Sequence, residues 1–133
     1  MDKSIIENLI EVAISTRKNA YAPYSGFKVG AGLLTLDGKV IGGCNIENAA
    51  YSPAICAERT AISTAVAAGH TKFTAIAVVG GENELIENCF PCGVCRQVLA
   101  EFCAPDFTVI IAKNTTEYQI FTLAELLPHI FSL

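Results

Sequence analysis

Three cysteines in two short segments have the residue type and the spacing of a metal site. Cys92 and Cys95 are three residues apart at the start of a predicted helix, so their sulfurs lie on one side of its first turn. Cys56 begins a second predicted helix and could add a third sulfur. A zinc–thiolate bond is only about 2.3 Å long, and this spacing lets the sulfurs reach one ion. The sequence therefore predicts one zinc ion held by Cys56, Cys92 and Cys95.

The predicted site has three protein ligands and no evident fourth. His70 and His129 lie outside both segments, and Cys89 is the one residue close enough in sequence to replace a ligand. A structural zinc ion takes four protein ligands, whereas a catalytic zinc ion keeps one position for water. Glu58 follows Cys56 by two residues, and residues two apart on a helix point to different sides. Cys56 must therefore sit at the helix cap, with Glu58 in the first turn reaching across to that water to shuttle protons. The pattern therefore favours a catalytic site.

The charge of the predicted centre also needs compensation. Zinc with three thiolates carries one net negative charge, which weakens its pull on a bound water. The positive ends of the two helices offset part of this charge, and Arg59 or Arg96, each next to a ligand segment, could donate to the sulfurs. We favour Arg59 because it adjoins Glu58, while Arg96 fits an ordinary solvated side chain equally well.

Other interpretations explain fewer of these residues. A redox pair at a helix start would use Cys92 and Cys95, but it leaves Cys56 and Glu58 without a role. A first-turn glutamate that complements the helix dipole would account for Glu58 alone. The remaining cysteines are interpreted as small buried or loop residues, and they are Cys44, Cys89 and Cys103.

Composition limits the class of protein. The net charge is −4 and no run of Lys or Arg occurs, so a nucleic-acid polymer is not an expected partner. No apolar stretch approaches the roughly 20 residues that span a membrane, and Met1–Glu7 lacks the order of a signal peptide. We therefore expect a cytoplasmic protein in which the cysteines stay reduced.

The length and apolar content make a second set of predictions. The 133 residues suit one domain, residues 1–133. Apolar residues make up 52% of the chain, and the mean hydropathy is +0.44. A domain of this size has limited interior for so much apolar surface, so part of it is expected to be buried between subunits.

Hydrophobic periodicity and turn residues predict nine elements. A first helix follows a capping box formed by Ser4 and Glu7, and Asp37-Gly38 is expected to join a two-residue hairpin. The predicted strands are 27–36, 39–44, 73–79, 107–112 and 117–121. The other predicted helices are 56–68, 92–103 and a short one after Thr122, which forms a capping box with Glu125. This order predicts an α/β fold, a three-layer α-β-α sandwich around a five-stranded mixed sheet.

Four ordered motifs resemble the small cytidine deaminases over nearly the whole chain. Cys-Ala-Glu followed by Pro-Cys-x-x-Cys is the signature of zinc deaminases. A C-terminal match, Glu125-Leu126-Leu127-Pro128 with Phe131, also fits. The motifs are Tyr21-Ala22-Pro23-Tyr24-Ser25, Gly43-Cys44-Asn45-Ile46-Glu47-Asn48-Ala49, Cys56-Ala57-Glu58-Arg59-Thr60-Ala61 and Pro91-Cys92-Gly93-Val94-Cys95-Arg96-Gln97.

The resemblance implies an enzyme of pyrimidine salvage that converts cytidine or deoxycytidine to uridine or deoxyuridine and ammonia. It implies a homotetramer with one zinc ion per subunit and with active sites shared between subunits. In such enzymes zinc-bound hydroxide attacks C4 of the base, and the residue matching Glu58 shuttles protons.

The resemblance also assigns residues to the substrate. Asn45 and Glu47 match the residues that hold the ribose hydroxyls, and Phe27 matches the one that packs on the pyrimidine ring. The backbone around Ala57 and Cys92 would contact the edge of the base. Two further matches contribute at the site shared between subunits, and they are Tyr51 and Phe131.

Two alternatives stay open at this level. One is a deaminase for a related small aminopyrimidine or a nucleoside-like antibiotic, against which Asn45 and Glu47 argue because they suit a ribose. The other is a zinc-stapled interaction module without enzymatic activity.

Overall fold

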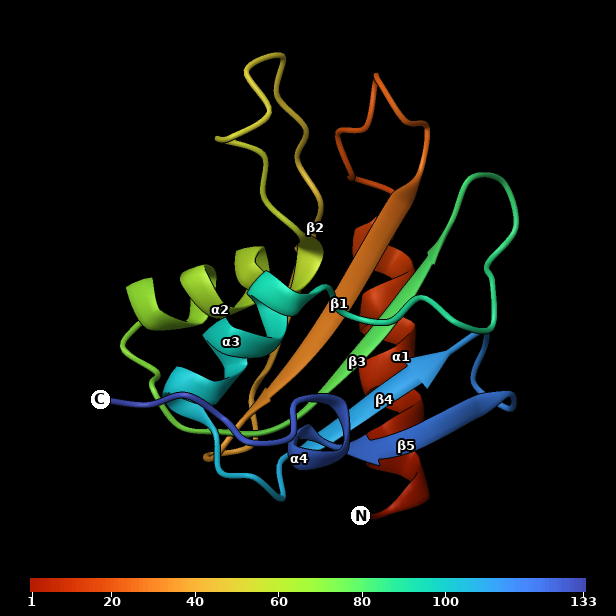
Figure 1. Ribbon diagram of the computed structural model, residues 1–133. Helices are drawn as coiled ribbons and strands as arrows, with labels where there is room; N and C mark the ends of the chain where they lie inside the picture. The colour runs from red at the N-terminus through yellow and green to blue at the C-terminus, as the bar shows by residue number, and fades with distance from the viewer.

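The computed structural model describes residues 1–133, which form one mixed sheet with helices on both faces (Figure 1). The strand order is β2-β1-β3-β4-β5, in which only β3 and β4 pair in parallel. The strands are β1 (Lys28–Thr35), β2 (Val40–Cys44), β3 (Phe73–Gly81), β4 (Thr108–Ala112) and β5 (Tyr118–Thr122). The helices are α1 (Lys3–Arg17), α2 (Ala57–Ala67), α3 (Gly93–Phe102) and α4 (Leu123–Leu126).

The helices divide between the two faces of this sheet. Helix α1 packs on one face, against β1, β2 and β3, while α2 packs on the other face against β2 and β1. Helix α3 lies beside α2 in front of the sheet, and α4 follows β5 below it (Figure 1). The predicted three-layer α-β-α sandwich with a five-stranded mixed sheet is confirmed. None of the helices is both long and apolar enough to cross a membrane.

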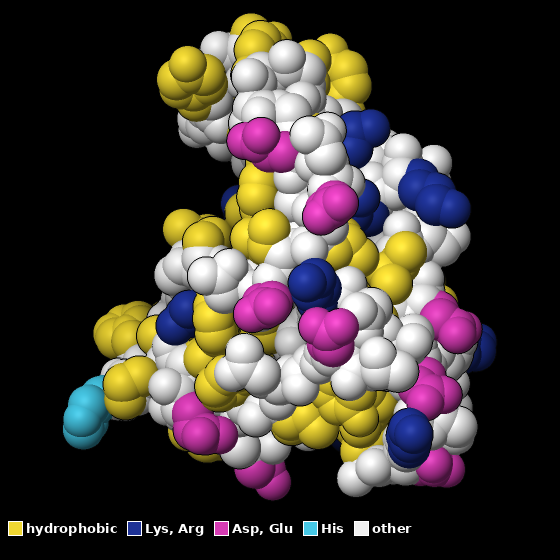
Figure 2. Space-filling view, turned by 90° about the vertical axis from the view of Figure 1, so that its right-hand side faces the viewer, with side chains coloured by type: hydrophobic (Ala, Val, Ile, Leu, Met, Phe, Trp, Pro, Cys, Tyr) yellow, Lys and Arg dark blue, Asp and Glu magenta, His cyan; other side chains and the backbone are white.

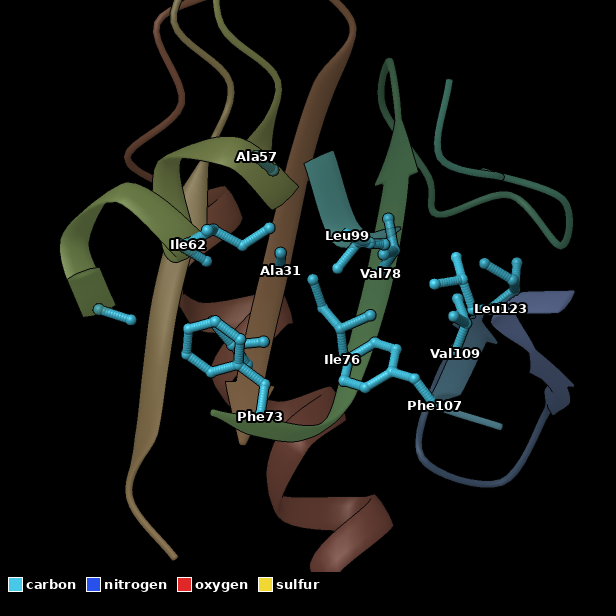
Figure 3. Packing of buried hydrophobic residues seen from close by; sticks show 14 of the residues in the cluster. Ala31, Ala57, Ile62, Phe73, Ile76, Val78, Leu99, Phe107, Val109 and Leu123 are labelled. Atoms are coloured by element: carbon cyan, nitrogen blue, oxygen red, sulfur yellow. The ribbon is translucent and has the colours of Figure 1, made fainter. Parts of the chain in front are cut away.

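Strand β3 supplies both hydrophobic cores because successive strand side chains point to opposite faces. Ala75, Ala77 and Val79 are buried in the core on the α1 face. Ile76 and Val78 are buried in the opposite core, which Figure 3 shows beneath α2 and α3. The nearly continuous apolar sequence of β3 thus fits a strand covered on both faces.

Several local predictions need correction. The cap of α1 is Asp2, whose carboxylate accepts from the Ser4 amide, so the predicted Ser4–Glu7 capping box is wrong. The Thr122–Glu125 capping box is confirmed. The first hairpin has a longer loop than predicted, because Thr35 already bonds Lys39 through backbone and side chain.

Candidate metal and catalytic site

Two helix starts meet at the proposed ligand cysteines. Cys56 is the N-cap of α2 and Cys92 is the N-cap of α3, both with extended backbone angles. Neither side chain caps its own helix, so both sulfurs are free to face the space between the helices. The Cys92 sulfur lies 3.8 Å from that of Cys56 and 3.5 Å from that of Cys95. All three sulfurs lie within 4.8 Å of one another and could hold a metal ion.

The start of α2 rests directly on the sheet. A Cβ on Gly43 of β2 would meet the carbonyl oxygen of Ala57 and the backbone of Ala61, so only glycine permits this approach. Ala57 and Ala61 are fully buried at the contact. The positions of Cys56 and Glu58 are therefore set by direct contact between the backbones of α2 and β2, with no long side chain separating the helix from the strand.

The chemistry of the three sulfurs fits a soft divalent cation. Hydrogen bonding from the Cys95 thiol, followed by that from Arg59, lowers the pKa of Cys56 to about 5. The same bond to Cys56, together with burial, raises the pKa of Cys95. One thiolate thus forms readily, and its charge opposes the next. A bound cation removes that conflict because it stabilises all three thiolates, and zinc accepts such a donor set.

Glu58 lies in the first turn of α2 and is only 3% exposed. Burial, together with the negative charge of Cys56, raises the pKa of its carboxyl to about 7. A carboxyl group that exchanges its proton near neutral pH is suited to act both as acid and as base. The structure therefore brings a proton carrier to the same helix start as one of the three sulfurs.

The two candidate arginines have different partners. The Arg59 guanidinium lies 3.7 Å from the Cys56 sulfur, and its buried Nε has no hydrogen-bond partner. Arg96 instead donates to the backbone carbonyl of Pro91 at 2.7 Å and to that of Leu126. Arg59 is thus the arginine that faces the sulfur cluster, whereas Arg96 ties α3 to the C-terminal segment.

A cavity of about 330 Å³ opens over the Glu58 side chain. Its lining includes residues of two loops, 18–27 and 45–56. These loops project beyond the sheet and the helices (Figure 1). Figure 2 shows the projecting part overhanging a notch in the surface. The lining residues come from these loops, from β1, from the start of α2 and from the segment before α3, and they include Phe27, Val29, Asn45, Glu47, Cys56, Ala57, Glu58, Cys89 and Phe90.

The predicted ribose-binding residues, Asn45 and Glu47, face this cavity but already have partners. Asn45 accepts from the Val29 amide at 2.8 Å and donates to the Phe27 carbonyl at 2.8 Å. Glu47 accepts from the amide and hydroxyl of Ser25, and these bonds lower its pKa. Carboxylate and amide oxygens have more than one lone pair, so both side chains keep capacity for a hydroxyl.

Two predicted site residues lie away from the cavity of their own chain. Tyr51 is 80% exposed and has a φ of 60°, and Phe131 is 68% exposed. Neither lines the cavity, whereas Phe27, Asn45, Glu47 and Ala57 do. Their assignment to a site shared between subunits stays a prediction.

From the sequence, Cys89 is interpreted as a loop residue or a replacement ligand and Phe90 is assigned no role, yet both line the cavity. Cys89 is buried, with its sulfur against Gly80, and burial raises its pKa to about 12. It stands outside the sulfur cluster and so is not among the candidate ligands. Phe90 packs edge-on against Phe121 with ring centroids 5.4 Å apart. Their one sequence signal is the position directly before Pro91, at the start of the second ligand segment.

Comparisons with known proteins agree with this geometry. Residues 3–111 match the model of the cytidine and deoxycytidylate deaminase zinc-binding region. A cytidine deaminase of Sporosarcina psychrophila is 46% identical over 96% of this chain and 91% of its own length. One of Halalkalibacterium halodurans is 48% identical over 93% of this chain and 92% of its own. The crystal structure of cytidine deaminase from Burkholderia pseudomallei matches with a TM-score of 0.85 and 48% identity, covering 93% of this chain and 97% of that one.

Proposed function

Because this chain belongs to the cytidine and deoxycytidylate deaminase family, we propose that it hydrolyses cytidine and deoxycytidine to uridine and deoxyuridine. Ammonia is the second product. The observation that carries this proposal is the buried Glu58 carboxyl, which lies beside three clustered sulfurs in the wall of a cavity of about 330 Å³. This volume lies within the roughly 300–1,000 Å³ of small-molecule sites.

The cofactor is one zinc ion per subunit, held by Cys56, Cys92 and Cys95. The family model is that of a zinc-binding region, and the sulfur cluster has the donor set that zinc accepts. When bound, zinc lowers the pKa of a water molecule and so supplies a nucleophile at neutral pH. The two helix N-termini and Arg59 stabilise the negative charge of the sulfurs.

Glu58 moves the protons of the reaction. Its carboxylate takes a proton from the attacking water and delivers it to N3 of the base as the water oxygen joins C4. It then carries the second proton of that water to the departing amino group, which leaves as ammonia while C4 becomes a carbonyl carbon. The pKa of about 7 suits both directions of transfer.

The cavity walls hold the nucleoside. The Phe27 ring packs on the pyrimidine, since aromatic faces suit a flat base. The backbone at Ala57 contacts the base edge, and Asn45 and Glu47 receive the ribose hydroxyls with their remaining hydrogen-bonding capacity. An ionised Glu47 favours hydroxyl donors, which supports a ribose-bearing substrate over a free aminopyrimidine.

The assembly is a homotetramer in which Tyr51 and Phe131 complete the pocket of a neighbouring subunit. Both side chains are large, mostly exposed and absent from their own chain's cavity. Figure 2 shows hydrophobic side chains at the tip of the projecting part, and exposed residues of its loops include Tyr21, Tyr24 and Tyr51. We further propose that residues 1–133 act as one catalytic domain, in the cytoplasm, in pyrimidine salvage.

An activity assay on the purified protein tests the reaction. The absorbance change of cytidine, deoxycytidine and cytosine is followed with and without a zinc chelator, and bound metal is measured in parallel. We expect turnover of the two nucleosides, little turnover of cytosine, and loss of activity when the metal is removed. Stoichiometric zinc without deamination of any substrate would instead favour a zinc-stapled interaction module. Turnover of free cytosine alone would favour a base deaminase.

Hydrodynamic size tests the shared site. A tetramer of 14.1 kDa chains should elute at a much larger apparent mass than the monomer. Phe131→Ala should lower the activity of the whole tetramer, because each subunit's pocket would lose this side chain of a neighbour. An active monomer would contradict the shared pocket and leave the metal site unaffected.

A further inference from the structure

Arg17 lies at the last turn of α1, on the opposite face of the sheet from the sulfur cluster. Its side chain is half-buried and makes hydrogen bonds to backbone carbonyls alone. The Nε atom donates to Lys28 at 2.9 Å, and an Nη atom donates to Gly81 at 2.6 Å and to Asn83 at 3.5 Å. No carboxylate forms an ion pair with it. Such a use of one guanidinium indicates a role in fixing the backbone.

The carbonyls that Arg17 binds belong to the ends of two neighbouring strands. Lys28 and Gly81 are the final pair of the ladder between β1 and β3, and past them the two chain segments separate. Lys28 directly follows Phe27, which lines the cavity. Gly81 begins the connection that carries the other wall, at Cys89 and Phe90. Arg17 therefore joins the last paired residues of β1 and β3, next to the segments that form the cavity walls.

Side chains of the two walls both pack against Gly80 of β3. A Cβ on Gly80 would collide with the Cys89 sulfur and come close to the Phe27 ring. A displacement of either strand end would thus change the space between these two side chains. Phe27 is also held from the cavity side, since Asn45 donates to its carbonyl at 2.8 Å. The adjoining carbonyls of Phe27 and Lys28 are thus bound by Asn45 and by Arg17, respectively.

The close packing of α1 on β1 brings Arg17 to this place. A Cβ on Gly30 would meet the carbonyl of Ala13 and the Cβ of Arg17, so the last turn of α1 lies directly on the strand. The planar fork of a guanidinium can then reach two carbonyls at once, which the single ammonium of lysine does less well.

We propose that Arg17 is a positioning residue for substrate binding: from the back of the sheet it fixes the two strand ends that carry the walls of the nucleoside cavity. This inference rests on the proposed function. The cysteines and Glu58 are carried by α2 and α3 and make no bond with Arg17. Loss of the guanidinium should therefore weaken substrate binding more than it slows the chemical step.

Steady-state kinetics of the zinc-loaded enzyme test this inference. We expect Arg17→Gln to raise the KM for cytidine by roughly tenfold, the effect of losing a charge-assisted hydrogen bond, with kcat changed less than threefold (about 0.7 kcal/mol). Arg17→Lys should recover part of the loss and remain testable if the first variant folds poorly. The matched control is Lys18→Gln, which removes the same charge from an exposed neighbour that makes no side-chain hydrogen bond.

Hydrogen exchange gives a readout that does not depend on turnover. In Arg17→Gln, exchange should rise in residues 25–28 and 82–90 while α2 and α3 stay protected. An unchanged KM and unchanged local exchange in an active enzyme would overturn the role of Arg17 alone. Exchange that rises evenly across the chain would overturn it as well, because it would mark a general stability effect. A wild-type protein that does not deaminate cytidine would overturn the proposed function and, with it, this substrate role.

Discussion

Helices α2 and α3 both have a cysteine as their N-cap. The residue two positions after the cap, in the first turn, nevertheless differs between them. In α2 this residue is Glu58, 3% exposed, and in α3 it is Val94, 58% exposed. In α2 the next residue is Arg59, which contacts a sulfur, whereas in α3 it is Cys95, and Arg96 after it binds carbonyls. The two helices therefore share the three clustered sulfurs, while only α2 adds a buried carboxyl and an arginine that contacts a sulfur.

The strongest test of this difference is Glu58→Gln, compared with Val94→Thr at the same position of α3. We expect Glu58→Gln to lower kcat by roughly a thousandfold, in the range of general acid–base catalysis, because the amide cannot carry the proton. Bound metal should stay near wild type, since Glu58 is outside the sulfur cluster. Val94→Thr keeps size and should retain activity. Near-normal turnover by Glu58→Gln would refute its proton-carrying role.

Replacing the two cap cysteines tests the part that the helices share. Cys56→Ala and Cys92→Ala should each weaken metal binding by more than the roughly 10–100-fold that loss of a residue behind a metal ligand costs. Cys89→Ala is the control, because Cys89 lines the cavity but lies outside the cluster. Metal content after dialysis against a weak chelator measures the effect. Loss of metal from Cys89→Ala would indicate that Cys89 is a metal ligand, contrary to its place outside the sulfur cluster.

The raised pKa of Glu58 also predicts that the stability of the metal-free protein depends on pH. Burial raises its pKa from 4.5 to about 7 in the folded chain, so the folded state holds a proton that the unfolded state gives up between these values. The contribution of Glu58 to stability is therefore fully present below about pH 4.5 and is lost as pH rises to about 7. In metal-free protein, Glu58→Gln should be more stable than wild type by roughly 3 kcal/mol above pH 7. Urea unfolding at both ends of this range measures it, and a gain that does not depend on pH would contradict the cause.

The arginines give the smallest and most direct contrast. The Cys95 thiol and then Arg59 lower the pKa of Cys56, so Arg59→Gln should raise the pKa of that thiol. Thiolate absorbance of the metal-free protein measures the shift. Arg96→Gln should leave this pKa unchanged and instead reduce stability by about 1–2 kcal/mol, because it frees the carbonyls of Pro91 and Leu126. A thiol pKa that responds equally to both substitutions would remove the distinction between the helix starts.

Most elements of the fold could be predicted, because their signals are local. The apolar run of β3 and the capping box at Thr122 identify a buried strand and a helix start in the sequence itself. The extension of β3 to Gly81 depends on pairing with Lys28 of β1, which no local pattern reveals. The Ser4–Glu7 pattern misled because Asp2, two residues earlier, offers its carboxylate to the same helix end.

The candidate site was predictable where chemistry restricts residue type. Few alternatives explain cysteines at this spacing beside Glu58, and the structure brings the three sulfurs together. The partners of Asn45 and the contacts of Arg17 are backbone atoms far away in the sequence. The spacing of residues along the chain therefore could not predict these hydrogen bonds. Whether Tyr51 and Phe131 reach a pocket stays a prediction, since it depends on subunit packing.

The burial of Cys89 has a consequence for inhibitor chemistry. A thiol inside the cavity invites nucleoside analogues that carry an alkylating group, yet the pKa of Cys89 is about 12. At neutral pH roughly one molecule in 10⁵ would present the reactive thiolate. Analogues that bind reversibly to the cavity walls should therefore outperform electrophiles aimed at this sulfur.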